Sequence, residues 1–262
     1  MQVISSKDNE IIKNIRKLKE KKYRDEQNAY IIEGIKLIKE AIVENVKIRQ
    51  IVMCENFADN KDLDKDTLYE IAKYNLIYVT EKVFNLITDV KTPQGIIAVI
   101  EKGNVDKKID YSQDIIIALD GIQDPGNLGT ILRTVDSANL NQIILSKNSA
   151  DPYNPKVVRS TMGGIFRINI IGVDSLKETI KEIKKNNFRI MVTSLDTNNS
   201  IYDVEYFKKV IVIGNEANGV STEVQKLADE KVKIPMLGKT ESLNASVATG
   251  IMIYEYVRRK ER

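Results

Sequence analysis

Histidine is absent from the 262 residues, and cysteine occurs once, as Cys54. Without histidine the chain lacks Ser-His-Asp and Cys-His catalytic groups, His-ligated zinc, and an imidazole base that titrates near neutral pH. A single cysteine can form neither an internal disulfide nor a thiolate metal cluster. Chemistry in this chain therefore depends on carboxylates, amides, hydroxyls, backbone groups, basic side chains or a bound cofactor, and we expect no metal.

Long hydrophobic runs are missing too. The longest are five residues, at 96–100 and 115–119, whereas a membrane-spanning helix needs roughly 20. The N-terminal residues contain no apolar block that would predict a secretory signal. Hydrophobic residues make up 42% and charged residues 29% of the chain, which is typical of a globular protein. We expect a cytoplasmic protein without a membrane partner.

Net charge is also small, at +3 from 40 basic and 37 acidic residues, so the total indicates no particular partner. The basic residues are nevertheless clustered at 13–24, where apolar residues recur at helical spacing and predict an amphipathic helix. A solvated helix surface explains this cluster as well as a surface for RNA phosphates does. The candidate RNA-binding residues in it are Lys13, Arg16, Lys17, Lys21, Lys22 and Arg24.

Short apolar strands alternate with helical patterns along the whole chain. In the first half this alternation predicts a small α/β unit. The second half restarts with a buried strand at 114–119 and continues with further strands and helices, which predicts a parallel sheet covered by helices. Residues 102–113 are polar and lack an apolar period, so they predict a linker. We therefore expect domains at 1–101 and 114–262.

Three loops of the second half have a composition suited to a binding site. They span 120–129, 213–220 and 234–246, and each directly follows an apolar strand. In parallel α/β sheets, functional residues lie in loops at the carboxyl ends of the strands. Taken singly, each loop is better explained by a glycine turn or a capped helix. Three such loops in one sheet together favour a functional site.

The residues of these loops carry a resemblance. In this order and at this separation they resemble the three motifs of the SpoU (TrmH-like) family of RNA 2'-O-ribose methyltransferases, within the SPOUT superfamily. The resemblance covers about residues 114 to 259, and residues 4–34 are more weakly similar to the L30e-like substrate-binding domain of some members. The matching residues are Asn127 and Arg133; Gly214, Asn215, Glu216 and Gly219; and Ile234-Pro235-Met236, Ser242-Leu243-Asn244 and Ser246-Val247-Ala248.

The resemblance implies a fold and an assembly. The family fold is a deep trefoil knot, which neither periodicity nor composition could predict, since true knots are almost absent from proteins. It also implies a homodimer with the C-terminal helix in the interface. A helix that packs only within its own chain explains residues 243–259 equally well.

The resemblance also implies a reaction, in which S-adenosylmethionine methylates a ribose 2'-hydroxyl of a structured RNA. Ribosomal RNA is the expected substrate. Arg133 is expected to activate that hydroxyl electrostatically, and whether it also acts as a base is left open. The other expected catalytic residues are Asn127, Glu216, Ser242 and Asn244. Cofactor binding is expected at Thr193, Ser194, Leu195, Gly214, Asn215, Ile234, Met236, Leu243 and Ser246. RNA binding is expected at the basic cluster, Arg133 and Arg159.

Three alternatives remain open at this stage. The RNA could be a transfer RNA, or the chain could be a non-catalytic RNA-binding or ribosome-assembly protein that keeps the fold. The intact set of Asn127, Arg133, Glu216 and Asn244 argues against the second. A nucleotide-binding oxidoreductase is disfavoured because the chain lacks the GxGxxG fingerprint.

Overall fold

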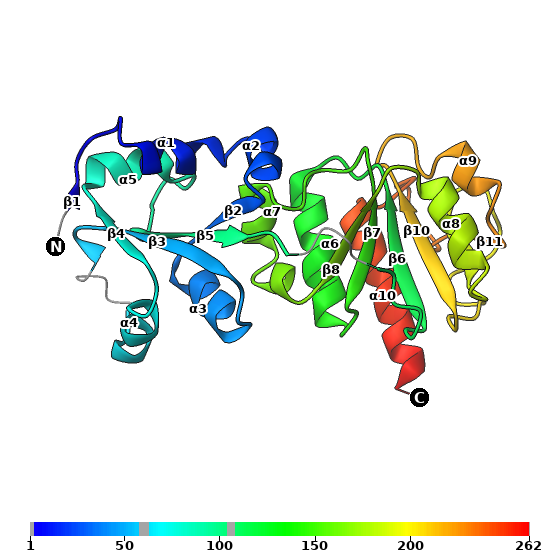
Figure 1. Cartoon of the computed structure of the whole chain (residues 1–262). Coiled ribbons are helices and arrows are strands. Elements are labelled where there is room, and N and C mark those ends of the chain that lie inside the picture. The colour runs from blue at the N-terminus through cyan, green and yellow to red at the C-terminus, as the bar shows by residue number, and fades with distance from the viewer. Residues whose placement is uncertain (1–2, 58–62, 104–107, 262) are drawn as a thin grey trace. The chain divides into compact units, whose positions relative to one another are not determined.

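The computed structural model describes residues 3–57, 63–103 and 108–261. The chain forms two compact units (Figure 1). The first contains residues 1–105 together with 153–166, and the second contains 106–152 and 167–262. Of the predicted linker, residues 104–107 lie outside the described residues. The functional domain boundaries at 1–101 and 114–262 stay a prediction.

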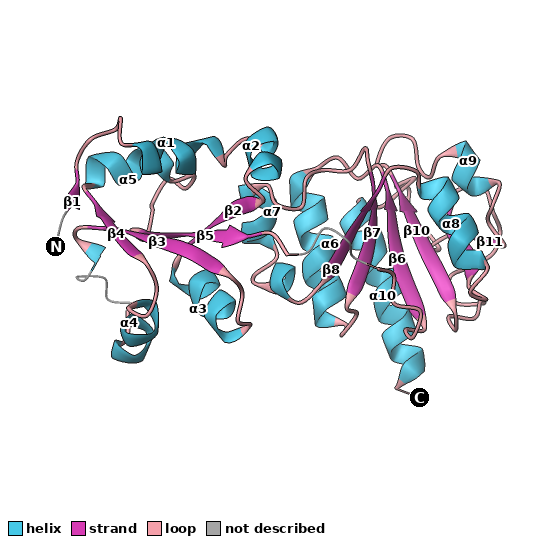
Figure 2. Ribbon diagram, viewed as in Figure 1, coloured by secondary structure: helices cyan, strands magenta, loops and turns pink. Residues whose placement is uncertain are grey.

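The first unit is built on a five-stranded sheet with the order β1-β4-β3-β5-β2. Helices α1 and α5 pack on one face of this sheet and α3 and α4 lie on the other (Figure 2), so its core is an α/β sandwich. Strand β5 runs antiparallel to its neighbours β3 and β2, while β4 pairs in parallel with β1 and β3. The elements are β1 (Val3–Ile4), α1 (Glu10–Lys17), α2 (Lys21–Glu26), β2 (Ala29–Glu33), α3 (Ile35–Val43), β3 (Ile48–Cys54), α4 (Lys65–Ile71), β4 (Leu76–Val79), α5 (Glu81–Ile87), β5 (Ile96–Glu101) and α7 (Pro155–Ser160).

The basic cluster forms two helices and not the single helix that its periodicity predicts. Helix α1 ends with Leu18 as its C-cap, and α2 begins after Glu20. Arg24 lies under the break, because its Nη1 donates hydrogen bonds to the carbonyl oxygens of Leu18 and Lys19 at 2.8 and 2.7 Å. The prediction that Arg24 binds RNA is therefore corrected, since its side chain is buried and satisfies the backbone at this corner.

The second unit is built on a six-stranded sheet with the order β11-β9-β10-β6-β7-β8. Each neighbouring pair is parallel, which confirms the predicted parallel sheet. Its elements are β6 (Ile115–Asp120), α6 (Pro125–Ser137), β7 (Gln142–Ser146), β8 (Asn169–Val173), α8 (Leu176–Lys184), β9 (Arg189–Thr193), β10 (Lys209–Gly214), α9 (Thr222–Gln225), β11 (Glu230–Val232) and α10 (Ala245–Lys260). The predicted knot is not defined by this strand order and stays a prediction.

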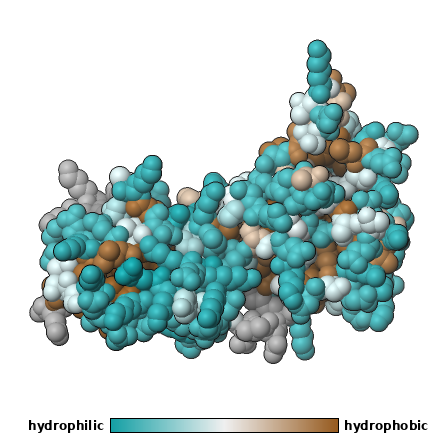
Figure 3. Space-filling view, turned by 90° about the horizontal axis from the view of Figure 1, so that it is seen from above, coloured by the Kyte–Doolittle hydropathy of each residue, from teal (hydrophilic) through white to brown (hydrophobic). Residues whose placement is uncertain are grey.

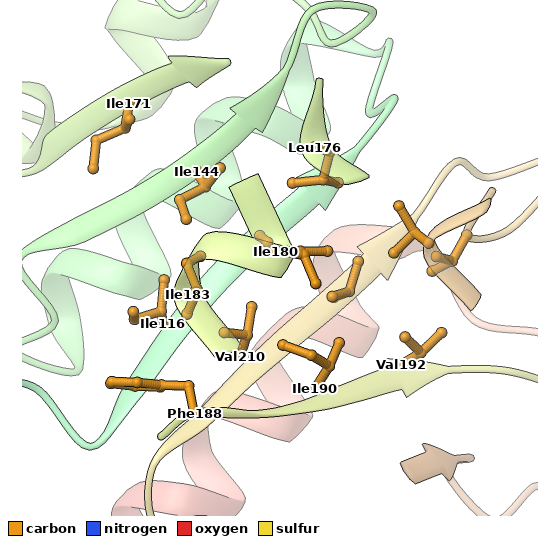
Figure 4. Close-up of a cluster of buried hydrophobic side chains, with 14 residues drawn as sticks. Ile116, Ile144, Ile171, Leu176, Ile180, Ile183, Phe188, Ile190, Val192 and Val210 are labelled. Atoms are coloured by element: carbon orange, nitrogen blue, oxygen red, sulfur yellow. The ribbon is translucent and has the colours of Figure 1, made fainter. Parts of the chain in front are cut away.

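Helices cover both faces of the parallel sheet. Helices α6 and α10 pack against each other on one face, and α8 and α9 lie on the other. Under α8 and α9 the strands contribute isoleucine and valine side chains to one buried cluster, into which Ile180 and Ile183 of α8 point (Figure 4). Burial of both faces explains why these strands are nearly continuous apolar runs.

The C-terminal helix is locked to the segment between β9 and β10 by a carboxylate and two arginines. Glu255 is buried, and Arg258 and Arg259 donate hydrogen bonds to its Oε1 at 2.7 and 2.6 Å. Arg259 also donates to the carbonyl oxygens of Val204 and Tyr202 at 2.8 and 2.5 Å. The hydrogen bond from Arg258, with that from Arg259, lowers the pKa of Glu255 from its ordinary value to about 2, although burial opposes the change.

The surface seen from above in Figure 3 is largely hydrophilic, with hydrophobic residues in separate patches. Among the described residues, no helix has the length and hydrophobicity required to span a membrane.

Replacing Glu255 tests the lock on α10. Because the pKa of Glu255 is lower in the folded state, its carboxylate stabilises the fold above the unfolded-state pKa, and this contribution is lost as the pH falls toward 2. Glu255→Gln is therefore expected to lower the free energy of unfolding by about 3 kcal/mol at pH 7, and by less at pH 3. Denaturant unfolding at both pH values measures this. The control is Glu205→Gln at an exposed position, and an equal loss in both variants at pH 7 would contradict the assignment.

Candidate functional site

The direction in which successive strands are added to the parallel sheet reverses between β6 and β10. From β6 the chain proceeds outward through β7 and β8, and it then returns to the other side of β6 with β9 and β10. Such a switch point leaves a crevice at the carboxyl ends of the two central strands, where ligands of parallel sheets bind. Asp120 and Gly214 are paired across these two strands at that end. The three predicted loops follow β6, β10 and β11.

The loop after β6 is held in place by Asp120. Its Oδ2 accepts the backbone N–H of Ser221 at 2.8 Å, which ties the end of β6 to the end of the loop that follows β10. Gly121 then adopts a positive φ of 75° that turns the chain toward α6. Asp124 is the N-cap of α6, and its side chain accepts the N–H of Asn127 at 2.8 Å. Asn127 thus stands in the first turn of the helix, and its side chain is free for other contacts.

The loop after β10 is a tight hairpin. The backbones of Asn215 and Gly219 exchange two hydrogen bonds, and a Cβ on Gly214 would lie only 2.1 Å from the carbonyl carbon of Gly219. The side chain of Asn215 donates to the carbonyl of Gly121 at 2.8 Å and accepts the N–H of Ala217 at 2.9 Å. Asn215 is thus engaged in shaping the loop, and the hairpin places Glu216 at an exposed tip.

The third loop ends at the N-terminus of α10. Ser242 and Asn244 are both suitable N-cap residues by type, and the structure assigns the cap to Asn244. The Oδ1 of Asn244 accepts the N–H and the hydroxyl of Ser246, at 2.9 and 2.7 Å. This uses the oxygen of the amide, so the Nδ2 group of Asn244 must point away from its own helix.

Asn127, Glu216 and Asn244 form one hydrogen-bonded chain across the three loops. Asn244 Nδ2 donates to Asn127 Oδ1 at 2.9 Å, and Asn127 Nδ2 donates to Glu216 Oε1 at 2.6 Å. The order of donors and acceptors is dictated at both ends, by the capping role of Asn244 and by a carboxylate that only accepts. The arrangement brings together three of the five predicted catalytic residues, with fixed orientations of both amides.

The other two predicted catalytic residues, Arg133 and Ser242, are exposed, and each lies a few residues from Asn127 or Asn244 in the chain. Arg133 lies on α6 and Ser242 lies two residues before the α10 cap, and neither side chain makes a hydrogen bond or ion pair with the described residues. The structure therefore does not join them to the chain of amides. It leaves the Arg133 guanidinium and the Ser242 hydroxyl available to an incoming ligand.

The predicted cofactor residues lie at the carboxyl ends of three neighbouring strands. Thr193 ends β9 and Gly214 ends β10, while Ile234 follows β11, which pairs in parallel with β9. Thr193 Oγ1 donates to the carbonyl of Val212, and Ser194 donates its N–H to Val232. The remaining predicted residues stand on the same loops, with Leu195 exposed, Met236 and Leu243 half-buried, and Ser246 buried.

The rim of these loops carries exposed apolar side chains. The side chain of Leu195 is 66% exposed and that of Leu237 is fully exposed, although leucine side chains are usually buried. The space beside Gly214 is filled by the backbone of Gly219 and Val220, so the missing side chain there shapes the hairpin. The rim therefore offers a ligand apolar side chains that the described chain does not cover.

The predicted RNA-binding residues other than Arg133 lie in the first unit. Arg16, Lys17 and Lys21 are exposed and have no acidic partner among the described residues. Lys13 and Lys22 are paired with Glu10 and Glu26 in exposed ion pairs, which contribute little and can be exchanged for a phosphate. Arg159 stands on α7, which also packs in the first unit.

Sequence reasoning missed Asp120, Asp124 and Ser221 as residues that shape the site. The sequence does contain a pattern for the two aspartates. Asp120 ends the β6 strand, and Asp124 stands immediately before a proline that opens a helix. The contact between Asp120 and Ser221 joins residues 101 positions apart. No local pattern could have predicted it.

Substitution of Gly214 tests the hairpin. In Gly214→Ala the new methyl group would meet the backbone of Gly219 and Val220, so we expect the free energy of unfolding to fall by about 1–3 kcal/mol. Gly238→Ala is the matched control, since a Cβ there has no heavy atom within 4 Å. Equal stability of the two variants in thermal unfolding would contradict this close approach.

Comparison with known families agrees with this geometry. The SpoU rRNA Methylase family model matches residues 114–254, which is more than half of the chain and includes all three loops. An MRM3-like substrate binding domain model matches residues 9–98. The resemblance inferred from the three motifs is thereby confirmed, as is the presence of an N-terminal substrate-binding domain.

Individual relatives cover nearly the whole chain. The chain is 31% identical to the 23S rRNA (guanosine(2553)-2'-O)-methyltransferase RlmP of Bacillus subtilis, over 97% of this chain and 98% of that protein. It is 34% identical to a putative TrmH family tRNA/rRNA methyltransferase of Staphylococcus epidermidis, over 88% and 96%. The crystal structure of an AdoMet-bound rRNA methyltransferase from Sinorhizobium meliloti superposes with a TM-score of 0.85 at 31% identity, covering 99% and 98%. The chain therefore belongs to the SpoU rRNA methylase family.

Proposed function

We propose that this chain transfers a methyl group from S-adenosylmethionine to a ribose 2'-hydroxyl of ribosomal RNA. The observation that carries the proposal is the hydrogen-bonded chain of Asn127, Glu216 and Asn244 at the switch point of the sheet. It brings one residue from each family motif into a single site. We place the reaction in the cytoplasm, where ribosomal RNA is found and where the single, free Cys54 stays reduced.

The cofactor would be held by the loops after β9, β10 and β11. Backbone groups near Gly214 and Ile234 would contact its polar parts, and Leu195, Met236 and Leu243 would contact its apolar parts. When bound, S-adenosylmethionine supplies an electrophilic methyl group whose transfer needs no metal and no imidazole. The rest of the task is to orient the ribose and to stabilise the oxygen that attacks.

Arg133 is the residue we assign to the attacking hydroxyl. Transfer would form the oxygen–methyl bond and break the sulfur–methyl bond, with S-adenosylhomocysteine as the leaving group, and the hydroxyl proton would pass to water. A guanidinium beside the oxygen stabilises the negative charge that develops there. Because arginine is protonated at any physiological pH, we assign Arg133 electrostatic activation. Asn127, Glu216, Ser242 and Asn244 then orient the RNA around it.

The first unit would bind the RNA outside the reacting nucleotide. The exposed cations Arg16, Lys17 and Lys21 on α1 and α2 would contact phosphates, which bind basic clusters independently of sequence. Ribosomal RNA is favoured over transfer RNA because the chain carries a separate substrate-binding domain and because its relatives of nearly full length include a 23S rRNA enzyme.

We also propose that the enzyme is a homodimer through α10. Val247 and Tyr254 are 50% and 49% exposed on this helix, and Ile251 between them is half-buried. A row of apolar side chains at helical spacing on an exposed face is typical of an interface. A second copy of the chain is its expected occupant.

Replacing Arg133 tests the catalytic assignment. Arg133→Ala is expected to lower the rate of methyl transfer about 10²- to 10³-fold, because one stabilising donor is lost from the site. Arg133→Lys keeps the charge and should recover part of that rate. The measurement uses labelled S-adenosylmethionine and ribosomal RNA from cells that lack the gene, followed by mapping of alkali-resistant linkages.

The control for this experiment is Lys226→Ala, which removes an exposed cation beyond the end of α9. Cofactor affinity, measured by calorimetry, should stay within twofold of wild type in each variant. A normal methylation pattern in Arg133→Ala would refute its assigned role. Absence of cofactor binding by the wild-type chain would favour a non-catalytic RNA-binding protein.

A charge placed on the exposed face of α10 tests the dimer. Tyr254→Glu is expected to convert the dimer to a monomer at micromolar concentration, because a carboxylate would be buried without a partner. Phe207→Glu, at another exposed aromatic residue that is 67% exposed, should leave the dimer intact. Sedimentation analysis distinguishes the two. A wild-type chain that sediments as a monomer would contradict the proposal.

A further inference from the structure

The turn after α7 holds a methionine in an unusual backbone conformation. Among the described residues, six other than glycine have positive φ, and four of these are asparagines. Asparagine tolerates the left-handed region, whereas residues with long side chains rarely occupy it. The two exceptions are Met162 and Lys208, with φ of 53° and 50°.

Contacts of the side chain explain Lys208 but not Met162. The Nζ of Lys208 donates to the carbonyl of Tyr111 at 2.6 Å and lies 4.8 Å from the centre of the Phe188 ring. The side chain of Met162 is 52% exposed and belongs to neither buried cluster. Its strained backbone is therefore not offset by contacts of its own, and such uncompensated strain points to a functional role.

The neighbours of Met162 keep the turn from relaxing. Thr161 is 1% exposed, and its hydroxyl donates to the carbonyl of Val158 at 2.8 Å. Gly163 has a φ of 98°, and a Cβ there would approach Glu40 of α3 to 3.1 Å. The turn is thus fixed on both sides, and it presents the Met162 side chain to solvent.

Two unpaired cations lie on the helix that leads into this turn. Lys156 is exposed and Arg159 is half-buried, and neither side chain makes a hydrogen bond or ion pair with the described residues. Arg159 lines a small hollow with Glu33 and Asp89. Those carboxylates are engaged elsewhere, because Glu33 accepts from Thr88 and Asp89 pairs with Lys19.

We infer that Lys156, Arg159 and Met162, named here the α7 tip, form a contact for the substrate RNA. The two cations hold phosphates, and Met162 packs against the face of a base or ribose beside them. Methionine is among the apolar residues that pack against or between bases in nucleic-acid complexes. RNA offers apolar base faces next to phosphates, so it can engage both parts of the α7 tip. The inference rests on the proposed function and adds a second contact surface to it.

The test separates strain from binding. Met162→Asn suits the left-handed turn better, so we expect its melting temperature to rise by about 2 °C. Its affinity for ribosomal RNA from cells lacking the gene is nevertheless expected to fall about five- to tenfold. The dependence of that affinity on salt should be unchanged in Met162→Asn, whereas Arg159→Gln should reduce the salt slope by about one phosphate contact.

Two further variants make the result decisive. Met162→Leu keeps an apolar side chain and should bind RNA within twofold of wild type. Tyr69→Asn removes an exposed side chain from α4, the helix that precedes β4 in the chain. Strand β4 lies toward the end of the first sheet opposite β2, and this variant should also bind RNA normally. Wild-type RNA affinity in Met162→Asn, or a lowered melting temperature, would overturn the inference.

Binding is measured separately from methyl transfer, so the two proposals fail in different ways. If the wild type binds this RNA and transfers no methyl group, the proposed function fails. The α7 tip is then still supported or overturned by the affinities of the Met162 and Arg159 variants.

Discussion

The pairing of β6 with β10 is the constraint on which the site depends. Six residues of each strand pair in parallel, from Lys209 opposite Ile115 to Gly214 opposite Asp120. Side chains alternate along a strand, so a slip of one residue would exchange the side chains that β10 presents to its two buried faces and would remove Val210 and Val212 from the cluster under α8 and α9. The same register sets Asp120 beside the hairpin whose far end it binds at Ser221. Burial of the central strands thus fixes the geometry of exposed loops.

Polar contacts then transmit this register to residues that face a ligand. Asn215 fastens the hairpin to Gly121, and the amides of Asn127 and Asn244 connect Glu216 to the first turn of α10. A chain without histidine can use such contacts because its cofactor carries the reactive group. In the proposed reaction the protein supplies positions and charge, through the fixed amides and the exposed guanidinium of Arg133.

The sequence predicted the elements well where hydrophobic period and length agree, as in β6, β10 and α10. It was less reliable where a long-range contact decides the outcome. The spacing of the isoleucines at 11–15 predicts a single helix that continues toward Arg24. Instead, the Arg24 guanidinium donates to the carbonyl oxygens of Leu18 and Lys19, where the chain turns between α1 and α2. Similarly, Ser242 and Asn244 are both acceptable caps by type. Asn244 takes the role because its amide can cap α10 and also donate to Asn127. The motifs predicted the three residues Asn127, Glu216 and Asn244 that meet, and the structure adds the direction of each hydrogen bond.

Segment 153–166 shows that a compact unit of the structure need not end where a family match ends. It lies between β7 and β8 in the chain, yet it packs in the first unit, where α7 contacts β2. Strand β2 is an edge of its sheet, and its Tyr30 is buried with its ring centre 4.9 Å from that of Tyr153. Residues 1–105 alone would leave this aromatic side chain and the flank of an edge strand uncovered, which is costly in water and favours aggregation. The substrate-binding unit therefore needs a segment from the half of the chain that carries the motifs, and the same segment places Arg159 and Met162 on its surface.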